Sequence, residues 1–127
     1  MEEILEDEDL VARFEGAPFT GVAFERDERC GILSELTYVN GVQEGAARDW
    51  YPSGEMKATT WYRAGVQHGE EREWYSDGSR KLDARYEFGI LLERKAWSPD
   101  GTQTEHYVLG PDDPLQETLR LARAAIS

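Results

Sequence analysis

The sequence contains one cysteine and two histidines, residue types that act as nucleophiles, general bases and metal ligands: Cys30, His68 and His106. A thiol nucleophile needs a nearby base or positive charge that favours the thiolate, and no residue around Cys30 indicates such a setting. The two histidines stand alone, without a cysteine or a second histidine at the spacing of a metal site. Carboxylates are so abundant that no pair can be singled out as an acid–base pair. The sequence therefore predicts no catalytic residue, no metal site and no enzyme activity.

The glycines offer no cofactor site either. They recur at the spacing of chain turns and do not form the strand–loop–helix cradle that binds phosphates. No segment has the spacing of a calcium-binding loop. We expect no cofactor.

The remaining composition bounds the cellular setting. The single cysteine cannot close an intramolecular disulfide, which agrees with a reducing compartment. The first nine residues lack the basic start and apolar middle of a signal peptide, and no apolar run approaches the roughly 20 residues that span a bilayer. We expect a cytoplasmic protein that does not enter the membrane.

The chain is strongly acidic, with 26 acidic and 14 basic residues and a formal net charge of −12. Such a surface repels the phosphates of nucleic acids and anionic lipids, and it attracts basic proteins. Solubility alone is the alternative explanation of this charge. We expect no nucleic-acid partner.

An internal repeat of 24 residues determines which elements hold these side chains. Five residue positions agree on this period, and one interval in two of the series is 23. The series are Gly21, Gly45 and Gly69; Gly41, Gly65 and Gly89; Tyr38, Tyr62 and Tyr86; Trp50, Trp74 and Trp97; and Gly54, Gly78 and Gly101. A period of this length indicates one small structural unit per repeat.

Each repeat contains two turn signals. Segments 51–54, 75–78 and 98–101 carry proline, serine or aspartate followed by glycine, which is typical of a type I turn with a bulge that joins antiparallel strands. Segments 41–45 and 65–69 are the second expected turn. The six or seven residues between turns suit a strand and are too few for a helix. The sequence predicts a mainly β fold, a meandering antiparallel sheet of hairpin repeats.

Pairing across a three-residue loop, Tyr75 with Ser79 and Trp74 with Arg80, predicts the two faces of this sheet. One face should carry Arg72, Arg80, Leu82 and Ala84 together with the repeat aromatics, whose expected role is structural: Tyr38, Trp50, Tyr62, Trp74, Tyr86 and Trp97. The opposite, charged face should carry Asp49, Tyr51, Glu55, Lys57, Thr59, Trp61, Glu71, Glu73, Tyr75, Lys81, Asp83 and Arg85.

The ends of the single domain, residues 1–127, depart from the repeat. Residues 1–9 form an acidic segment, either a solvated tail or a short helix, and a first strand is expected over 10–14. The repeats occupy 10–109. A helix is expected over 111–126, with Asp113 as its N-cap and an apolar stripe that begins at Leu115. This helix either caps the last hairpin and covers a sheet edge or part of the aromatic face, or binds a partner.

The repeat pattern, Gly-x-x-x-x-Trp-Tyr-x-x-Gly followed by Tyr-x-x-Gly-x-x-His-Gly, resembles the bacterial variant of the MORN repeat. It is carried by Gly45, Trp50, Tyr51, Gly54, Tyr62, Gly65, His68, Gly69, Trp74, Tyr75, Gly78, Tyr86 and Gly89. Segment 18–24 also looks like the start of the family of YwqK-type antitoxins. The pattern departs from the family at Glu44, which replaces histidine, and after Gly89, where Ile90-Leu91-Leu92 brings no second glycine.

The resemblance implies an immunity or antitoxin protein that binds and neutralises a cognate toxin domain. The acidity agrees with a basic toxin, because electrostatic attraction would steer the two together. A scaffold that self-assembles without a toxin is the alternative, and the oligomeric state stays open. The residues expected to contact the partner are Asp49, Tyr51, Trp61, Glu71, Glu73, Tyr75 and Asp83.

Overall fold

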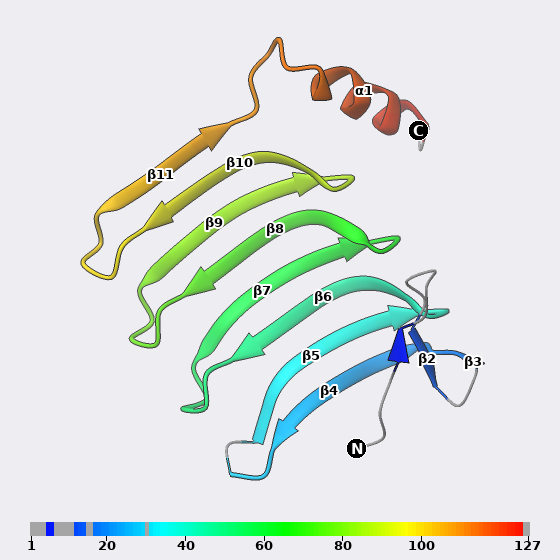
Figure 1. Ribbon diagram of the computed structural model, residues 1–127, viewed down its shortest axis with the longest axis vertical. Coiled ribbons are helices and arrows are strands. Elements are labelled where there is room, and N and C mark those ends of the chain that lie inside the picture. Colours follow the sequence, from blue (N-terminus) through cyan, green and yellow to red (C-terminus); the bar gives the residue numbers. More distant parts are fainter. Residues whose placement is uncertain (1–4, 7–11, 15–16, 30, 126–127) are drawn as a thin grey trace.

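The computed structural model describes residues 5–6, 12–14, 17–29 and 31–125. Most of them form an open eight-stranded sheet in which every strand is antiparallel to its neighbour in the chain, in the order β11-β10-β9-β8-β7-β6-β5-β4 (Figure 1). The strands are β4 (Gly21–Asp27), β5 (Gly31–Val39), β6 (Val42–Trp50), β7 (Met56–Arg63), β8 (Val66–Trp74), β9 (Arg80–Glu87), β10 (Ile90–Trp97) and β11 (Gln103–Val108). The expected meandering sheet is confirmed.

The turns at one end of the sheet follow the prediction. In each of the last three hairpins the glycine amide donates to a carbonyl three residues earlier, as Gly78 does to Tyr75 at 2.9 Å. The residue at the start of the turn then bonds across the hairpin, as the Tyr75 amide does to the Ser79 carbonyl at 2.9 Å. Gly78 has φ +88°, a left-handed conformation that an L side chain rarely adopts, which explains the glycine at this position.

The turns at the other end are tighter than predicted. The expected turn over 65–69 is wrong, because Ala64 and Gly65 alone form the turn and β8 already begins at Val66. Both residues have positive φ, 50° and 84°, as a two-residue type I′ turn requires. Asn40-Gly41 and Phe88-Gly89 have the same pair of conformations. The strands are therefore eight or nine residues long in β5 to β10 and not six or seven.

A bulge lies next to the turns of the first kind, those at the end of the sheet that includes Gly78. It changes which side chains share a face of the sheet. Trp74 pairs with Arg80 as expected, but Glu73 pairs with Leu82, so that Lys81 is an extra residue in β9. Because side chains alternate along a strand, one extra residue moves every later side chain to the opposite face. The hairpins β4–β5, β6–β7 and β10–β11 are shifted at the equivalent place.

The expectation that tryptophans and tyrosines share one face is therefore wrong. Leu82, Ala84 and Tyr86 lie on the same face as Glu73 and Glu71, and we call it the tyrosine face. Its members by strand register also include Leu36, Tyr38, Asp49, Ala58, Thr60, Tyr62, Arg94 and Glu105.

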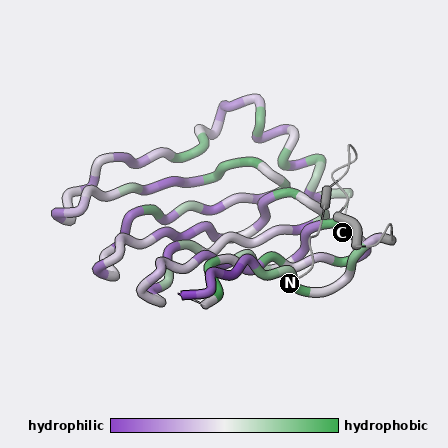
Figure 2. The backbone as a smooth tube through the Cα atoms, turned by 60° about the horizontal axis from the view of Figure 1, so that its bottom comes forward, coloured by the Kyte–Doolittle hydropathy of each residue, from purple (hydrophilic) through white to green (hydrophobic). Residues whose placement is uncertain are grey.

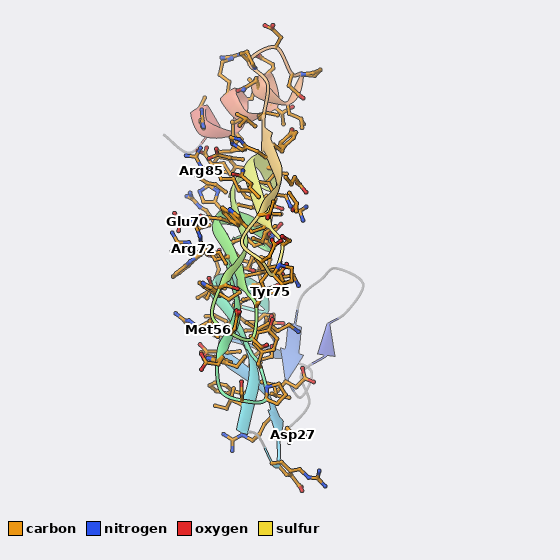
Figure 3. All side chains as sticks on the ribbon, turned by 90° about the vertical axis from the view of Figure 1, so that its left-hand side faces the viewer. Asp27, Met56, Glu70, Arg72, Tyr75 and Arg85 are labelled. Carbon is orange, nitrogen blue, oxygen red and sulfur yellow. The ribbon has the colours of Figure 1, made fainter. Side chains whose placement is uncertain are left out.

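The opposite face carries the pairs Arg72–Asp83 and Glu70–Arg85. By alternation Trp74 and the other two repeat tryptophans belong to it, as Trp50 does after Arg48. Figure 3 shows Glu70, Arg72 and Arg85 on the side of the sheet where the C-terminal helix lies. We call it the helix face.

The helix α1 spans Leu115–Ala125 and is the only helix in the described part of the chain. It begins four residues later than the expected range because Asp113 caps it: the Asp113 carboxylate accepts a bond from the Leu115 amide at 2.9 Å. Residue 126 lies outside the described residues.

The helix packs over the start of β10 and forms the largest apolar cluster. Leu119 is 2% exposed there against Ile90, Leu92 and Leu109, with Phe88 at the border. The Leu109 amide donates to Leu92 at 2.8 Å, which ties the chain to β10 just before the helix. Along the rest of the sheet, hydrophobic and hydrophilic residues are interleaved (Figure 2). The irregular sequence after Gly89 is thus the place where the helix docks.

The N-terminal part forms a second, three-stranded sheet of β1 (Leu5–Glu6), β2 (Ala12–Phe14) and β3 (Ala17–Pro18). It lies on the opposite side of the main sheet from α1 (Figure 3). The first strand expected over 10–14 corresponds to β2, with its first two positions outside the described residues, as is most of the acidic segment 1–9.

Within the described residues, no helix has the length and apolar character needed to cross a membrane.

Candidate functional site

The middle of the tyrosine face combines tyrosines with carboxylates. Tyr62 and Tyr86 lie on either side of β8, which places Glu71 and Glu73 between them. Asp49 continues the carboxylates onto β6, where it pairs with Ala58. Leu82 and Ala84 pair with Glu73 and Glu71 on the same face and are buried, at 5% and 3% exposed.

Carboxylates and burial act together on the ionisable groups of this region. Burial first, and the neighbouring Glu73 second, raise the pKa of Glu71 above its ordinary value. Burial and the charge of Glu71 also raise the pKa of both tyrosines, and Asp49 adds to the effect at Tyr62. Burial would disfavour a charge of either sign, but the contribution of the neighbouring carboxylates would be reversed by a positive charge from outside.

Basic side chains on this face compensate the carboxylates only in part. Lys81 approaches Glu73 at 3.9 Å, a distance at which a half-exposed pair contributes little. Arg94 is engaged with Glu105 on the neighbouring strand, at 3.3 Å. Glu71 accepts a hydrogen bond from the neutral amide of Gln67 at 3.4 Å and one from the Tyr86 side chain, and the charge of Arg94 favours its ionised form.

Two further tyrosines on this face are fixed in position by the repeat. The Tyr51 hydroxyl donates to the carbonyl of Trp74 at 2.7 Å, and the Tyr75 hydroxyl donates to that of Trp97 at 2.8 Å. Each tyrosine therefore joins its own hairpin to the next. Lys57 and Lys81 lie over the two rings at 5.8 Å and 5.6 Å. The tyrosines are partly exposed and held rigidly, so they would lose little conformational entropy on binding a partner.

On the helix face, in contrast, acidic and basic side chains form ion pairs with one another. Arg72 bonds Glu70 at 2.8 Å and approaches Asp83 at 3.8 Å. Further pairs lie along the same face: Arg48 with Glu35, His106 with Glu93, and Arg123 with Glu87. Such pairs at a solvated surface contribute little to stability, but they leave little net charge to attract a partner.

A shallow depression of about 320 Å³ lies on the helix face, lined by Glu70, Asp83, Ala84, Arg85, Glu93 and Lys95. Its walls carry both signs of charge and little apolar surface. It lacks the apolar lining that small-molecule pockets usually have.

The structure divides the residues that were expected to contact a partner. Asp49, Tyr51, Glu71, Glu73 and Tyr75 lie together on the tyrosine face. Trp61 and Asp83 lie on the helix face, where Trp61 pairs with Ala46 and is 45% exposed. The prediction that all seven residues share one charged face is therefore wrong for Trp61 and Asp83. The bulge adds one residue to the second strand of each hairpin, so the side chains beyond it lie on the face opposite to the predicted one.

The repeat aromatics contribute to packing on both faces. Tyr38 is 4% exposed and packs against Phe19 at 6.0 Å between ring centroids. Trp97 lies under the Arg80 guanidinium, 4.3 Å from its ring centroid, on the helix face. The other four are half-buried: Trp50, Tyr62, Trp74 and Tyr86.

Sequence reasoning missed one set of functional contacts, which joins successive repeats. The residue before each repeat glycine accepts a hydrogen bond from the first amide of a type I′ turn, 20 residues further on. The three bonds are Asn40 to Thr20, Ala64 to Glu44, and Phe88 to His68, at 2.7, 2.6 and 3.0 Å. The next amide in each turn donates to a backbone carbonyl of the previous repeat, as Gly65 does to Gln43. The 24-residue spacing of positions 20, 44 and 68 was the available signal.

The overall acidity is not concentrated on the tyrosine face. Positions 1–17 contain seven acidic residues and one basic residue, which is half of the net charge of −12. The carboxylates Asp49, Glu71 and Glu73 on the tyrosine face are a separate, local group.

No protein-family model matches the chain, and neither a curated protein nor a solved structure matches it.

Proposed function

We propose that this protein is a non-catalytic binding module whose tyrosine face takes up a basic protein domain. The observation that carries the proposal is the group of carboxylates Asp49, Glu71 and Glu73, set beside partly exposed tyrosines on an open sheet face. Tyrosine is among the residues that contribute most to binding at protein interfaces. A guanidinium or ammonium group from a partner would relieve the repulsion between Glu71 and Glu73.

The partner that we favour is a bacterial toxin domain. The repeat pattern resembles that of antitoxin proteins, and toxins that act on nucleic acids are commonly basic. An acidic protein with a flat aromatic face could cover the substrate site of such a domain. The cytoplasm is the expected compartment for this role.

A self-assembling scaffold is the second candidate. The sheet is open, with β4 and β11 as its edge strands, and all six residues of β11 are exposed. An exposed edge strand can pair with a strand of another copy. Concentration-dependent oligomers of the purified chain, without any partner, would favour this reading over the first.

The test uses matched charge reversals on the two faces. The chain is co-expressed with the protein encoded beside it, and growth and the dissociation constant of the purified pair are measured. Asp49→Lys and Glu73→Lys change the tyrosine face, whereas Glu70→Lys and Asp83→Lys change the net charge equally on the helix face.

We expect the first pair of variants to weaken binding at least tenfold each and to lose rescue of growth. The helix-face variants should stay within about threefold of the wild type, and salt should weaken the wild-type complex. Equal losses on both faces would contradict the assignment of the tyrosine face. If the neighbouring protein neither binds nor loses its toxicity, the immunity role fails.

A further inference from the structure

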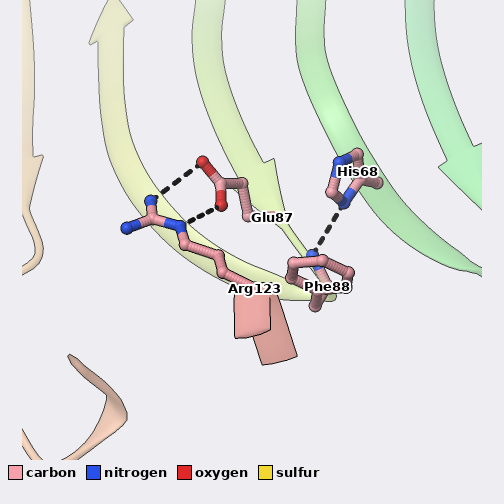
Figure 4. A network of polar contacts seen from close by, with 4 residues as sticks. All are labelled: His68, Glu87, Phe88 and Arg123. Carbon is pink, nitrogen blue, oxygen red and sulfur yellow. Dashed lines mark hydrogen bonds and ion pairs between the residues drawn. The ribbon is translucent and has the colours of Figure 1, made fainter. Parts of the chain in front are cut away.

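His68 contacts the Phe88-Gly89 turn, which borders the apolar cluster around α1, and one of its ring nitrogens accepts a hydrogen bond from this turn. The Phe88 amide donates to His68 Nδ1 at 3.0 Å, and the two rings pack edge to face with centroids 4.8 Å apart (Figure 4). An amide can donate only to an imidazole nitrogen that carries no proton. The imidazole in this bond is therefore neutral, with its proton on Nε2.

The other repeats fill the same position with different acceptors. Thr20 uses a hydroxyl oxygen and Glu44 a carboxylate oxygen. A hydroxyl oxygen keeps its lone pairs at any ordinary pH, and a carboxyl group keeps acceptor lone pairs whether or not it is protonated. An imidazole that takes up a proton has no acceptor lone pair left. Among these three contacts, mild acid can thus remove only the one beside α1.

Two contacts connect this turn to the helix. Phe88 borders the apolar cluster in which Leu119 is buried. Glu87, the residue before it, accepts hydrogen bonds from Nε and Nη2 of Arg123 in α1, at 2.7 and 2.9 Å (Figure 4). A displaced turn would therefore disturb both the apolar and the charged contact of the helix.

The charged groups around His68 act in opposing directions. Glu87 on β9 attracts a protonated imidazole, and the charge of His68 is among the influences that lower the pKa of Glu87. Arg123 on α1 and Arg85 on β9 lie near the same carboxylate, and Arg63 on β7 lies 5.9 Å from the Phe88 ring. These three cations repel a proton on the ring. A protonated His68 would also compete with Arg123 for Glu87.

We propose that His68 is an acid-sensitive latch, which holds α1 on the sheet while its Nδ1 accepts the Phe88 amide and releases the helix when it is protonated. The proton comes from solvent and occupies the lone pair that the amide used. The Phe88 amide is then without its acceptor, and Glu87 is shared between two cations. Release uncovers Ile90, Leu92 and Leu109, which form an apolar surface at the start of β10. This role does not depend on what the tyrosine face binds.

Amide hydrogen exchange of the helix tests the latch directly. Exchange of residues 115–125 is followed by mass spectrometry between pH 7.5 and pH 5.5, with rates corrected for the intrinsic effect of pH. We expect the protection of α1 to fall several-fold and at most about tenfold, while that of β8 stays constant.

Three variants separate the latch from a general acid effect. His68→Gln keeps an oxygen acceptor without titration, and His68→Thr reproduces the acceptor of Thr20. Both should dock the helix at pH 7.5 and show no loss at pH 5.5. His106→Gln, which removes the other histidine, should lose protection as the wild type does. Unchanged protection in the wild type at pH 5.5, or an equal loss in His68→Gln, would overturn the proposal.

Discussion

Replacing Leu119 by alanine measures how strongly the helix is held to the sheet. Leu119 is the most deeply buried side chain described, 2% exposed, and it fills the cluster formed by Ile90, Leu92 and Leu109. The substitution removes three carbon atoms from this environment. At about 0.8 kcal/mol for each buried methylene, the lost transfer free energy is about 2.4 kcal/mol.

The cavity that remains adds to this cost. Leucine-to-alanine changes in protein cores span about 2–5 kcal/mol, and the upper values belong to sites that cannot collapse. Ile90 and Leu92 are each 9% exposed, so this cluster lies near the surface and can close in part. We therefore expect Leu119→Ala to lower the free energy of unfolding by about 2.5–3.5 kcal/mol.

Urea unfolding followed by tryptophan fluorescence provides the measurement. An isolated helix of 11 residues is marginal in water, so a weakened α1 should detach as a unit. Detachment before the sheet unfolds would lower the urea dependence of the free energy as well as the midpoint.

Leu121→Ala is the matched control, because it makes the same chemical change on the same helix at a side chain that is 55% exposed. It should change stability by no more than about 0.5 kcal/mol. The reasoning is refuted if the two variants cost the same, or if Leu119→Ala costs less than about 1 kcal/mol with helix protection intact.

Three further outcomes follow from the fold. Tyr75→Phe removes the hydroxyl that joins one hairpin to the next and should cost about 0.5–1.5 kcal/mol in thermal unfolding, whereas Tyr107→Phe, at an exposed ring, should be neutral. Glu71→Gln should be more stable than the wild type at pH 7, because the fold disfavours the carboxylate. The raised pKa of Glu71 means that wild-type stability falls as pH rises above about 4.5, so the advantage should vanish at pH 4, and a constant difference would contradict this origin. Gly78→Ala should cost about 1–2 kcal/mol at φ +88°, and Gly110→Ala, in open space, should not; equal midpoints of the two in urea would rule out backbone strain as the reason for the glycine.

The turn chemistry shows where sequence reasoning succeeds. A serine, aspartate or proline followed by glycine fixes the local backbone, because only glycine adopts the required positive φ without strain. The hairpins joined at Gly54, Gly78 and Gly101 were predictable for this reason, and so was the N-cap at Asp113. The two-residue turns were also encoded, in the dipeptides that end at Gly41, Gly65 and Gly89. They were predicted too long because a second glycine follows four residues after Gly41 and Gly65, and the whole segment between the glycines was assigned to the turn.

The candidate site was predictable only within single strands. Asp49 and Tyr51, or Glu71, Glu73 and Tyr75, are two residues apart and must share a face in any strand. Their relation to Trp61 and Asp83 depended on the register across a hairpin. That register includes a bulge of one residue, which turn residues do not announce and which reverses the face of everything beyond it.

By itself, the sequence determined the period and the antiparallel meander, because these depend on local backbone preferences that repeat every 24 residues, and the C-terminal helix, because its N-cap and apolar stripe are local signals. Only the tertiary structure decided which side chains meet. It separated the repeat tryptophans from the repeat tyrosines, gathered partly compensated carboxylates on one face and paired the charges of the other. It also placed His68 in contact with the Phe88-Gly89 turn, next to the residues that hold α1. These outcomes depend on the register between strands and on contacts between separate elements, and no preference of a single segment contains them.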